Sequence, residues 1–156
     1  MHRFALALIR VAACTAVVLV AGTARLEAAK CSVSTTSLVF GSYNVFSPAP
    51  VDSTGTISYE CNGGAKTVLI TMTRGQSVTF LPRQLGKATE SLTYNLFLDA
   101  ARTTVWGDFS AGTSARSDVE PPNNHEVAVT IYGRIPAGQD ISAGSYSDTV
   151  TVVVNF

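Results

Sequence analysis

The sequence GSYSDTVTVVVNF, residues 144–156, alternates apolar and polar side chains. Its apolar residues fall on even positions: Tyr146, Val150, Val152, Val154 and Phe156. Because successive residues of a β-strand point to opposite faces, this pattern predicts a half-buried strand. Gly144 allows the chain to turn into it. A single strand of this kind is not stable alone, so it needs neighbouring strands.

Similar alternation predicts five more main strands. The first covers residues 31–40, with a break near 35–37 where the apolar positions change from odd to even. The others lie within 55–61, 66–73, 91–99 and 126–133, and the inward residues predicted for the last of these are Val127, Val129 and Ile131. Residues 77–85 and 102–108 are candidates for short extra strands, the first stopped by Pro82. Asn62-Gly63-Gly64 predicts a hairpin turn, and we expect loops at 41–54 and 110–124.

Six main strands separated by turn residues predict an all-β sandwich, and no segment has sustained helical periodicity. The N-terminus has the pattern of a secretory signal peptide: Arg3 and Arg10 are followed by an apolar run and then by small residues. We expect residues 1–29 to be this signal peptide, with cleavage between Ala24 and Ala29, and residues 30–156 to form one exported domain. The alternative is a buried N-terminal helix or a membrane anchor.

Removal of the signal would leave two cysteines, Cys31 and Cys61. Two cysteines in an exported domain of this size favour one structural disulfide. The alternative, a pair of metal-binding or redox thiols, is less favoured because the chain has no CxxC motif and His125 would be the only mature histidine. We therefore expect no metal site.

Charge and motifs exclude several classes of function. After cleavage at Ala29 the chain would carry eight basic and ten acidic residues, a net charge of −2, with no basic patch for nucleic acid. The sequence contains neither a nucleophile elbow nor a phosphate loop, and its acidic residues stand mostly at predicted turns. We expect no enzyme, no catalytic residues and no cofactor. Trp106 and Tyr94 could stack on a sugar, but we favour a place in the core for both.

Four segments of the chain carry a family resemblance: CSVSTTSLVFGSYNV, GTISYEC, SLTYNLFLDAARTTVWG and IYGRIPAGQDISAGSYSDTVTVVVNF. Together they closely resemble the spore coat protein U domain family, which includes subunits of archaic, Csu-type chaperone–usher pili. The resemblance covers the chain from Cys31 to Phe156. It implies an incomplete immunoglobulin-like sandwich of about six main strands that lacks its final strand, with a disulfide between Cys31 and Cys61.

The resemblance also implies how the sandwich is completed. In this family a periplasmic chaperone lends a strand to an open apolar groove, and a neighbouring pilin subunit later replaces it at an outer-membrane usher. Such a strand adds backbone hydrogen bonds at a sheet edge and places alternate side chains in pockets. We expect the groove and the chaperone-recognition surface to comprise Gly144, Tyr146, Val150, Val152, Val154 and Phe156, with Val127, Val129 and Ile131.

One departure from the family concerns the segment before Cys31. A subunit that donates a strand needs roughly ten alternating residues there, the length of a long strand, and RLEAAK has no such alternation. We therefore expect a chain that accepts a strand but does not donate one, located at a fibre tip on the cell surface. The alternatives are a spore coat or extracellular matrix protein without an usher, and an adhesin whose loops, including 110–124, bind a glycan or a surface.

Overall fold

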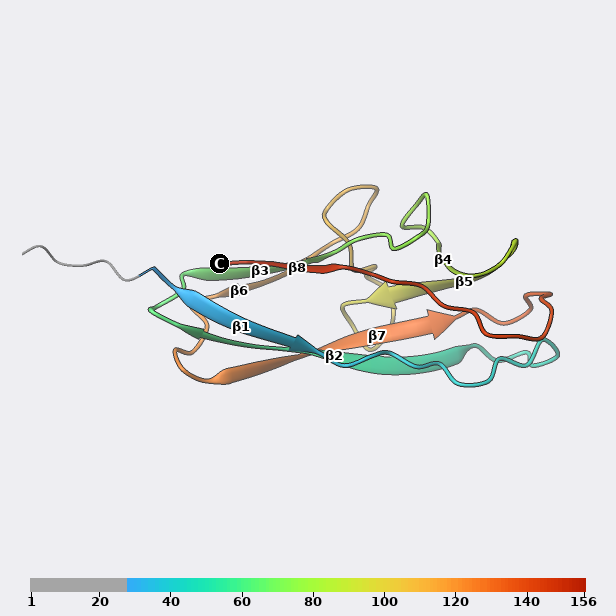
Figure 1. Ribbon diagram of the computed structural model, residues 1–156, viewed down its shortest axis with the longest axis horizontal. Coiled ribbons are helices and arrows are strands. Elements are labelled where there is room, and N and C mark those ends of the chain that lie inside the picture. The colour runs from blue at the N-terminus through green and yellow to red at the C-terminus, as the bar shows by residue number, and fades with distance from the viewer. Residues whose placement is uncertain (1–27) are drawn as a thin grey trace, which may run out of the picture.

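The computed structural model describes residues 28–156, which form two packed β-sheets (Figure 1). The five-stranded sheet contains, in spatial order, β1 (Lys30–Thr35), β2 (Val51–Asn62), β7 (Glu126–Ile135), β5 (Glu90–Phe97) and β4 (Arg83–Lys87). The three-stranded sheet contains β6 (Arg116–Val119), β3 (Thr67–Met72) and β8 (Val152–Asn155). All pairings within these named strands are antiparallel. The predicted signal peptide lies almost wholly outside the described residues.

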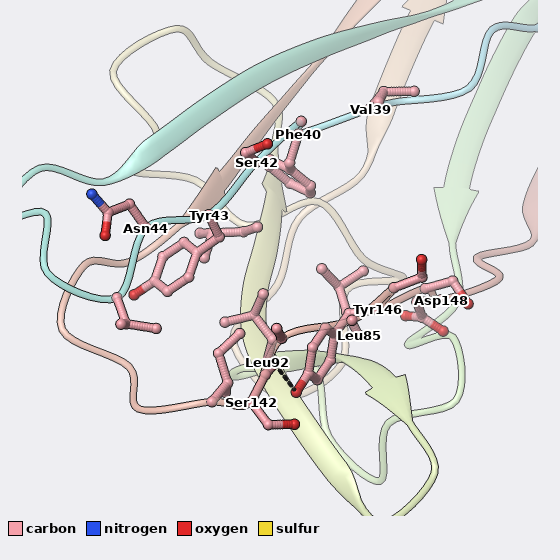
Figure 2. Close-up of a pocket in the computed structure, with 18 of the residues that line it drawn as sticks. Val39, Phe40, Ser42, Tyr43, Asn44, Leu85, Leu92, Ser142, Tyr146 and Asp148 are labelled. Carbon is pink, nitrogen blue, oxygen red and sulfur yellow. Dashed lines mark hydrogen bonds between the residues drawn. The ribbon is translucent and has the colours of Figure 1, made fainter.

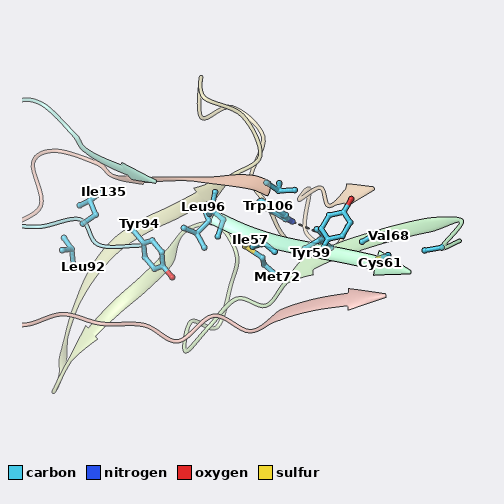
Figure 3. Packing of buried hydrophobic residues seen from close by; sticks show 14 residues of the cluster. Ile57, Tyr59, Cys61, Val68, Met72, Leu92, Tyr94, Leu96, Trp106 and Ile135 are labelled. Carbon is cyan, nitrogen blue, oxygen red and sulfur yellow. Dashed lines mark hydrogen bonds between the residues drawn. The ribbon is translucent and has the colours of Figure 1, made fainter. Parts of the chain in front are cut away.

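The core fills the space between the two sheets (Figure 3). Four strands with the predicted alternation contribute most of the core, because each strand directs every second side chain inward. These buried residues include Ile57, Tyr59 and Cys61 of β2, Val68, Ile70 and Met72 of β3, Leu92, Tyr94 and Leu96 of β5, and Val129, Ile131 and Ile135 of β7. Trp106 is fully buried as well, and its indole N–H donates to the Ile70 carbonyl at 3.0 Å.

The C-terminal segment bridges the two sheets along one long side of the molecule. Ser147 exchanges two backbone hydrogen bonds with Gly86 of β4, of 2.8 and 3.1 Å. Further along, Thr73 donates its N–H to the Thr151 carbonyl at 2.9 Å, and β8 then pairs with β3. One extended segment therefore contacts the edge of the five-stranded sheet first and the three-stranded sheet afterwards.

The side of the sandwich between β1 and β8 is open. β1 is an edge strand of the five-stranded sheet and β8 an edge strand of the three-stranded sheet, and no ladder joins them within residues 28–156. Figure 1 shows the two strands running in opposite directions. The same described residues contain no helix long and apolar enough to cross a membrane.

The structure corrects one predicted turn. Asn62-Gly63-Gly64 was expected to close a hairpin, but β2 and β3 lie in different sheets. Gly63 and Gly64 both adopt positive φ, +78° and +70°, which carry the chain across from one sheet to the other. The turn chemistry was identified correctly, whereas its consequence for pairing was wrong because the sequence does not state which sheet receives the next strand.

Four strand assignments also differ from the predictions. The predicted loop at 110–124 contains β6, which pairs with β3. The short edge strand expected before Pro82 lies after it, as β4, and β2 begins at Val51 inside the predicted loop 41–54. Residues 102–108 form only isolated bridges, at Val105 and Trp106. The predicted break in the first strand is present, since β1 ends at Thr35.

Candidate functional site

A groove follows the open side of the sandwich. It consists of two adjoining hollows with volumes of about 760 and 310 Å³, and the wider one is drawn in Figure 2. Four residues line both hollows and so connect them: Leu38, Phe40, Leu85 and Asp148. One wall comes from the chain that follows β1, residues 35–45, and the other from the chain that leads into β8, residues 141–152. The groove is therefore bounded by the two segments that no ladder connects.

The floor of the groove is the apolar core itself. It is lined by side chains from four strands: Met72 of β3, Leu85 of β4, Leu92, Tyr94 and Leu96 of β5, and Ile131 and Ile135 of β7. Most of these side chains are at least nine-tenths buried although they line an open hollow. The groove thus runs directly over the core, and no further strand of residues 28–156 lies on it.

Both walls present backbone groups to the groove. In an antiparallel pair, every second residue directs its N–H and C=O at the partner strand, and the residues between direct theirs away. Thr73 bonds to Thr151, so Val150, Val152 and Val154 direct their backbone groups away from β3. Thr36 donates to the Thr56 carbonyl at 2.9 Å, so by the same rule Cys31, Val33 and Thr35 of β1 face away from β2.

Two glycines allow the first wall, residues 35–45, to pack closely against the sheet. Leu38 and Phe40 pack over Gly133 of β7, where a Cβ atom would lie 2.8 Å from the Phe40 ring and 2.9 Å from a Leu38 methyl carbon. Gly55 of β2 lies under Leu38 in the same way, with 3.3 Å from the Cβ position to the Leu38 Cβ. The Phe40 ring meets the Tyr94 ring edge to face at 5.9 Å. The Leu38 and Phe40 side chains therefore position this wall, because they occupy the space left by the missing side chains of Gly55 and Gly133.

Asp148 places one carboxylate on the second wall. It accepts the Tyr94 hydroxyl at 2.7 Å and the backbone N–H groups of Gln76 and Thr149 at 2.8 and 2.7 Å. Burial raises the pKa of the Tyr94 hydroxyl, and the bond to Asp148 raises it further, so this tyrosine stays neutral. The hydrogen bonds tie the start of the C-terminal strand to β5 and to the loop after β3.

A hydrogen-bonded group joins the first wall to the chain that leaves β7, at the end of the wider hollow. The Tyr43 hydroxyl donates to the Pro136 carbonyl at 3.0 Å and accepts the Gln139 backbone N–H at 2.9 Å. The Gln139 side chain bonds the Thr93 backbone on both sides, accepting its N–H at 2.7 Å and donating to its carbonyl at 2.9 Å. The wider hollow is therefore bounded where residues 41–45 meet the chain that leaves β7.

The structure brings together five of the predicted groove residues. Gly144 and Tyr146 line the wider hollow, and Ile131, Val150 and Val152 line the narrower one. The others lie apart from both hollows: Val127, Val129, Val154 and Phe156. Val129 is buried in the core, and Phe156 is 55% exposed although it continues the even-numbered pattern.

The predicted disulfide is present and lies beside the open edge. Cys31 and Cys61 are directly opposite one another across β1 and β2, and their Cα atoms are 4.1 Å apart. Among the strands of residues 28–156, β2 alone pairs with β1. The covalent link therefore fixes an edge strand that has backbone hydrogen bonds on one side.

Several groove residues were not identified from the sequence. The outstanding ones are the wall residues Leu38, Phe40 and Tyr43 and the two glycines beneath the wall, Gly55 and Gly133. Glycine within a strand pattern often marks a close approach by another segment. Both glycines interrupt alternating segments, so this signal was available in the sequence. Tyr94 and Trp106 are buried, as favoured, and do not form an exposed platform.

The described residues contain no group of three or more side chains suited to a metal ion. A two-sheet sandwich with one unpaired side and an apolar groove along it is an incomplete immunoglobulin-like domain. The chain belongs to the Spore Coat Protein U domain family, whose model matches residues 14–153. This is a family of structural proteins, not of enzymes.

Two relatives illustrate the membership. Protein U of Myxococcus xanthus is 32% identical over 133 residues, which cover 77% of this chain and 72% of that protein. A similar solved structure is the CsuC–CsuE chaperone–tip adhesion subunit pre-assembly complex from the archaic chaperone–usher Csu pili of Acinetobacter baumannii. The match has a TM-score of 0.53 and 22% identity, and it covers 83% of this chain. This chain spans 40% of the matched chain, and the likeness concerns the fold.

Proposed function

We propose that this protein is a structural subunit of a chaperone–usher surface fibre, and that its groove binds one β-strand supplied by another protein. A periplasmic chaperone supplies the strand first, and a neighbouring subunit replaces it during assembly at an outer-membrane usher. Membership of the Spore Coat Protein U domain family and the fold shared with a chaperone-bound Csu subunit support this assignment.

The observation that carries the proposal is the pair of unpaired edges on either side of an apolar floor. A strand between residues 31–37 and 148–154 would find backbone groups on both sides, which satisfies its own N–H and C=O groups. Its inward side chains would pack over Met72, Leu85 and Leu96, which line the hollows. Burial of each such side chain contributes about 1.5–3 kcal/mol, so a few alternating apolar residues provide substantial affinity.

This function requires export, which rests on the proposed signal peptide at residues 1–29. The disulfide agrees with an oxidising compartment such as the periplasm. We further propose a location at the fibre tip. Lys30 already pairs with Asn62, so β1 is committed to its own sheet and any donor segment has to precede it. Determination of the mature N-terminus tests this point: a retained alternating apolar segment before Lys30 would contradict a tip location.

A synthetic peptide tests the groove directly. The probe is a fluorescent peptide of about ten residues, the length of a long strand, in which Ile or Val alternates with Thr or Ser. The control peptide has the same composition with its apolar residues in one block. We expect saturable binding of the alternating peptide and a rise in the unfolding midpoint of the full chain. Equal binding of both peptides, or of neither, would refute the groove.

A coat or matrix protein assembled without an usher is the second candidate. The observation in its favour is the 32% identity to Protein U over 77% of this chain, because it exceeds the 22% identity to the Csu complex. Deletion of a chaperone or usher gene that neighbours the gene for this protein distinguishes the two functions. Loss of the protein from the cell surface indicates a fibre subunit, whereas unchanged surface or coat levels indicate the second candidate.

A further inference from the structure

One part of the groove wall is held mainly by side chains. This part, residues 141–146, is called the strap below; it lies beside the wider hollow and leads into the C-terminal strand. Among the described residues, the backbone hydrogen bonds made outside the strands include none from 136–146, and the first one after the strap is at Ser147. Segments with few backbone bonds and high exposure open at low free-energy cost. The contacts that hold the strap therefore control its position.

Those contacts converge on the hairpin between β4 and β5. The Lys87 ammonium donates to the Ser142 hydroxyl and to the Ala143 carbonyl, each at 2.6 Å. The Glu90 carboxylate accepts the Tyr146 hydroxyl at 2.8 Å and also the Ser142 hydroxyl. Lys87 and Glu90 lie 3.5 Å apart, and the Lys87 ammonium is 5.4 Å from the centre of the Tyr146 ring. We call Lys87, Glu90, Ser142 and Tyr146 the clasp.

Gly144 makes room for the clasp. A Cβ atom at this position would lie 2.6 Å from the Lys87 Cε and 2.8 Å from its Nζ, so the lysine side chain crosses directly over the glycine. Gly144 also adopts a φ of +152°, which other residues rarely adopt. Figure 2 shows Ser142 and Tyr146 beside one another at the wall, joined by a hydrogen bond. The strap backbone is thus shaped to receive the Lys87 side chain.

We propose that the strap is a gate at the side of the wider hollow: the clasp holds it in its present position, and a strand enters or leaves this hollow when the strap moves outward. This inference rests on the proposed function, because it assigns a regulated step to the same groove. A strand that enters or leaves the wider hollow passes the strap, so the clasp slows both processes. The clasp is partly exposed, with 29% and 43% of the Lys87 and Glu90 side chains accessible, and its ionic contacts weaken as salt rises. Salt therefore opens the gate.

Three variants test the gate with the fluorescent alternating peptide in stopped-flow measurements on the full chain. Lys87→Met keeps the length of the side chain and removes its charge, Glu90→Gln removes the carboxylate charge, and Tyr146→Phe removes only the hydroxyl. Arg134→Met is the matched control: it breaks an exposed ion pair with Asp52, which lines neither hollow. Tyr146→Phe keeps the ring contacts of the wall and so guards against loss of folding.

We expect Lys87→Met and Glu90→Gln, at residues that line neither hollow, to raise the association and dissociation rate constants together by about fivefold with less than a twofold change in Kd. This agrees with the modest strength of exposed charged contacts. Tyr146→Phe should raise both rate constants as well. High salt should accelerate the wild type and Arg134→Met but not Lys87→Met. A rise in the dissociation rate constant alone would overturn the gate, because it means that the clasp only stabilises the bound state. Unchanged rate constants would overturn it as well. A wild type that binds no peptide would instead refute the proposed function.

Discussion

The guanidinium of Arg83 donates a hydrogen bond of 2.6 Å to the carbonyl of Trp106, and both residues are fully buried. Arg83 also donates to the Thr73 carbonyl and to the Asn95 side chain, at 2.9 and 2.8 Å. Within residues 28–156 no carboxylate lies within 4.0 Å of it. Burial lowers the pKa of Arg83, yet a guanidinium remains protonated at neutral pH. A buried cation thus joins the end of β3, β5 and the Trp106 segment.

We predict that Arg83→Met destabilises the protein by about 3 kcal/mol or more, because it leaves the buried Trp106 carbonyl and the part-buried Thr73 carbonyl without their donor. It also removes one of the two donors to the Asn95 amide oxygen. Arg83→Lys should recover only part of this loss, since an ammonium cannot reproduce the planar fork of donors. Urea unfolding of the full chain measures the effect. Gln84→Met, at the exposed neighbouring position, is the control. Equal stability of Arg83→Met and the wild type would show that the bonds contribute nothing.

The alternation in the C-terminal strand predicts a difference between neighbours. Val152 lines the groove, whereas Thr151 is exposed. Val152→Asp should abolish peptide binding, because a carboxylate would be buried among apolar side chains without a partner. Thr151→Asp should lower the affinity by less than about threefold, as is usual for exposed substitutions. Periplasmic yield and peptide binding measure both effects, and equal losses for the two variants would mean that the strand register is wrong.

Gly133 should affect the groove more than the fold. An alanine there would displace Leu38 and Phe40, whose side-chain ends can move, so we expect Gly133→Ala to cost about 1 kcal/mol or less of stability. The displaced wall should nevertheless weaken peptide binding roughly tenfold, because added volume shifts the side chains that line the groove. Gly86→Ala adds the same methyl group with contacts of 3.8 Å or more and is the control. A stability loss without an affinity loss would contradict this role for Gly133.

Loss of the disulfide should act through the unfolded state. Cys31 and Cys61 are 30 residues apart in sequence, and closure of a loop of that length stabilises a protein by roughly 3 kcal/mol in the chain-entropy model. We expect the Cys31→Ala/Cys61→Ala double variant to lose about that amount in urea unfolding. Reduction of the wild type with dithiothreitol should give the same shift. No change in the midpoint would mean that the β1–β2 ladder alone positions the edge strand.

Acid should weaken one surface ion pair. The hydrogen bond from Arg134 lowers the pKa of Asp52, and the charge of Arg102 contributes as well, so the folded state favours the ionised carboxylate. Its stabilising effect is therefore present above the ordinary pKa of an aspartate and is lost as pH falls through the lowered value. An NMR titration should find the Asp52 midpoint below 3.8. In Arg134→Met the midpoint should rise toward 3.8; an unchanged midpoint would refute the role of Arg134.

Residue patterns alone predicted much of the fold but only part of the groove. Alternation identified the inward faces of β2, β3, β5 and β7, because burial imposes a period of two on any strand with one face in the core. Pairing was harder to predict. Glycines 63 and 64 indicate a turn whether the next strand joins the same sheet or the opposite one. β6 has four residues and is too short to show a clear alternation.

The open side could not be predicted from patterns because an unpaired strand edge has no periodicity of its own. Val150 and Val152 alternate in the same way whether a neighbour is present or absent. Recognition of the groove needed the structure, which places Leu38 over Gly133 and leaves the core exposed beside it. Residues such as Val127 and Val129 were assigned to the groove because they are inward and apolar, yet they lie outside both hollows.

The opposite directions of β1 and β8 have a consequence for polarity. A strand inserted between them is necessarily parallel to one neighbour and antiparallel to the other, whichever way it points. If the inserted strand is reversed, its parallel ladder becomes antiparallel and its antiparallel ladder becomes parallel. One ladder of each kind is formed in both cases, so backbone hydrogen bonding hardly favours either orientation. Side-chain fit in the two unequal hollows then determines the orientation. Under the proposed function, the chaperone strand and the subunit strand that replaces it are therefore free to run in opposite directions.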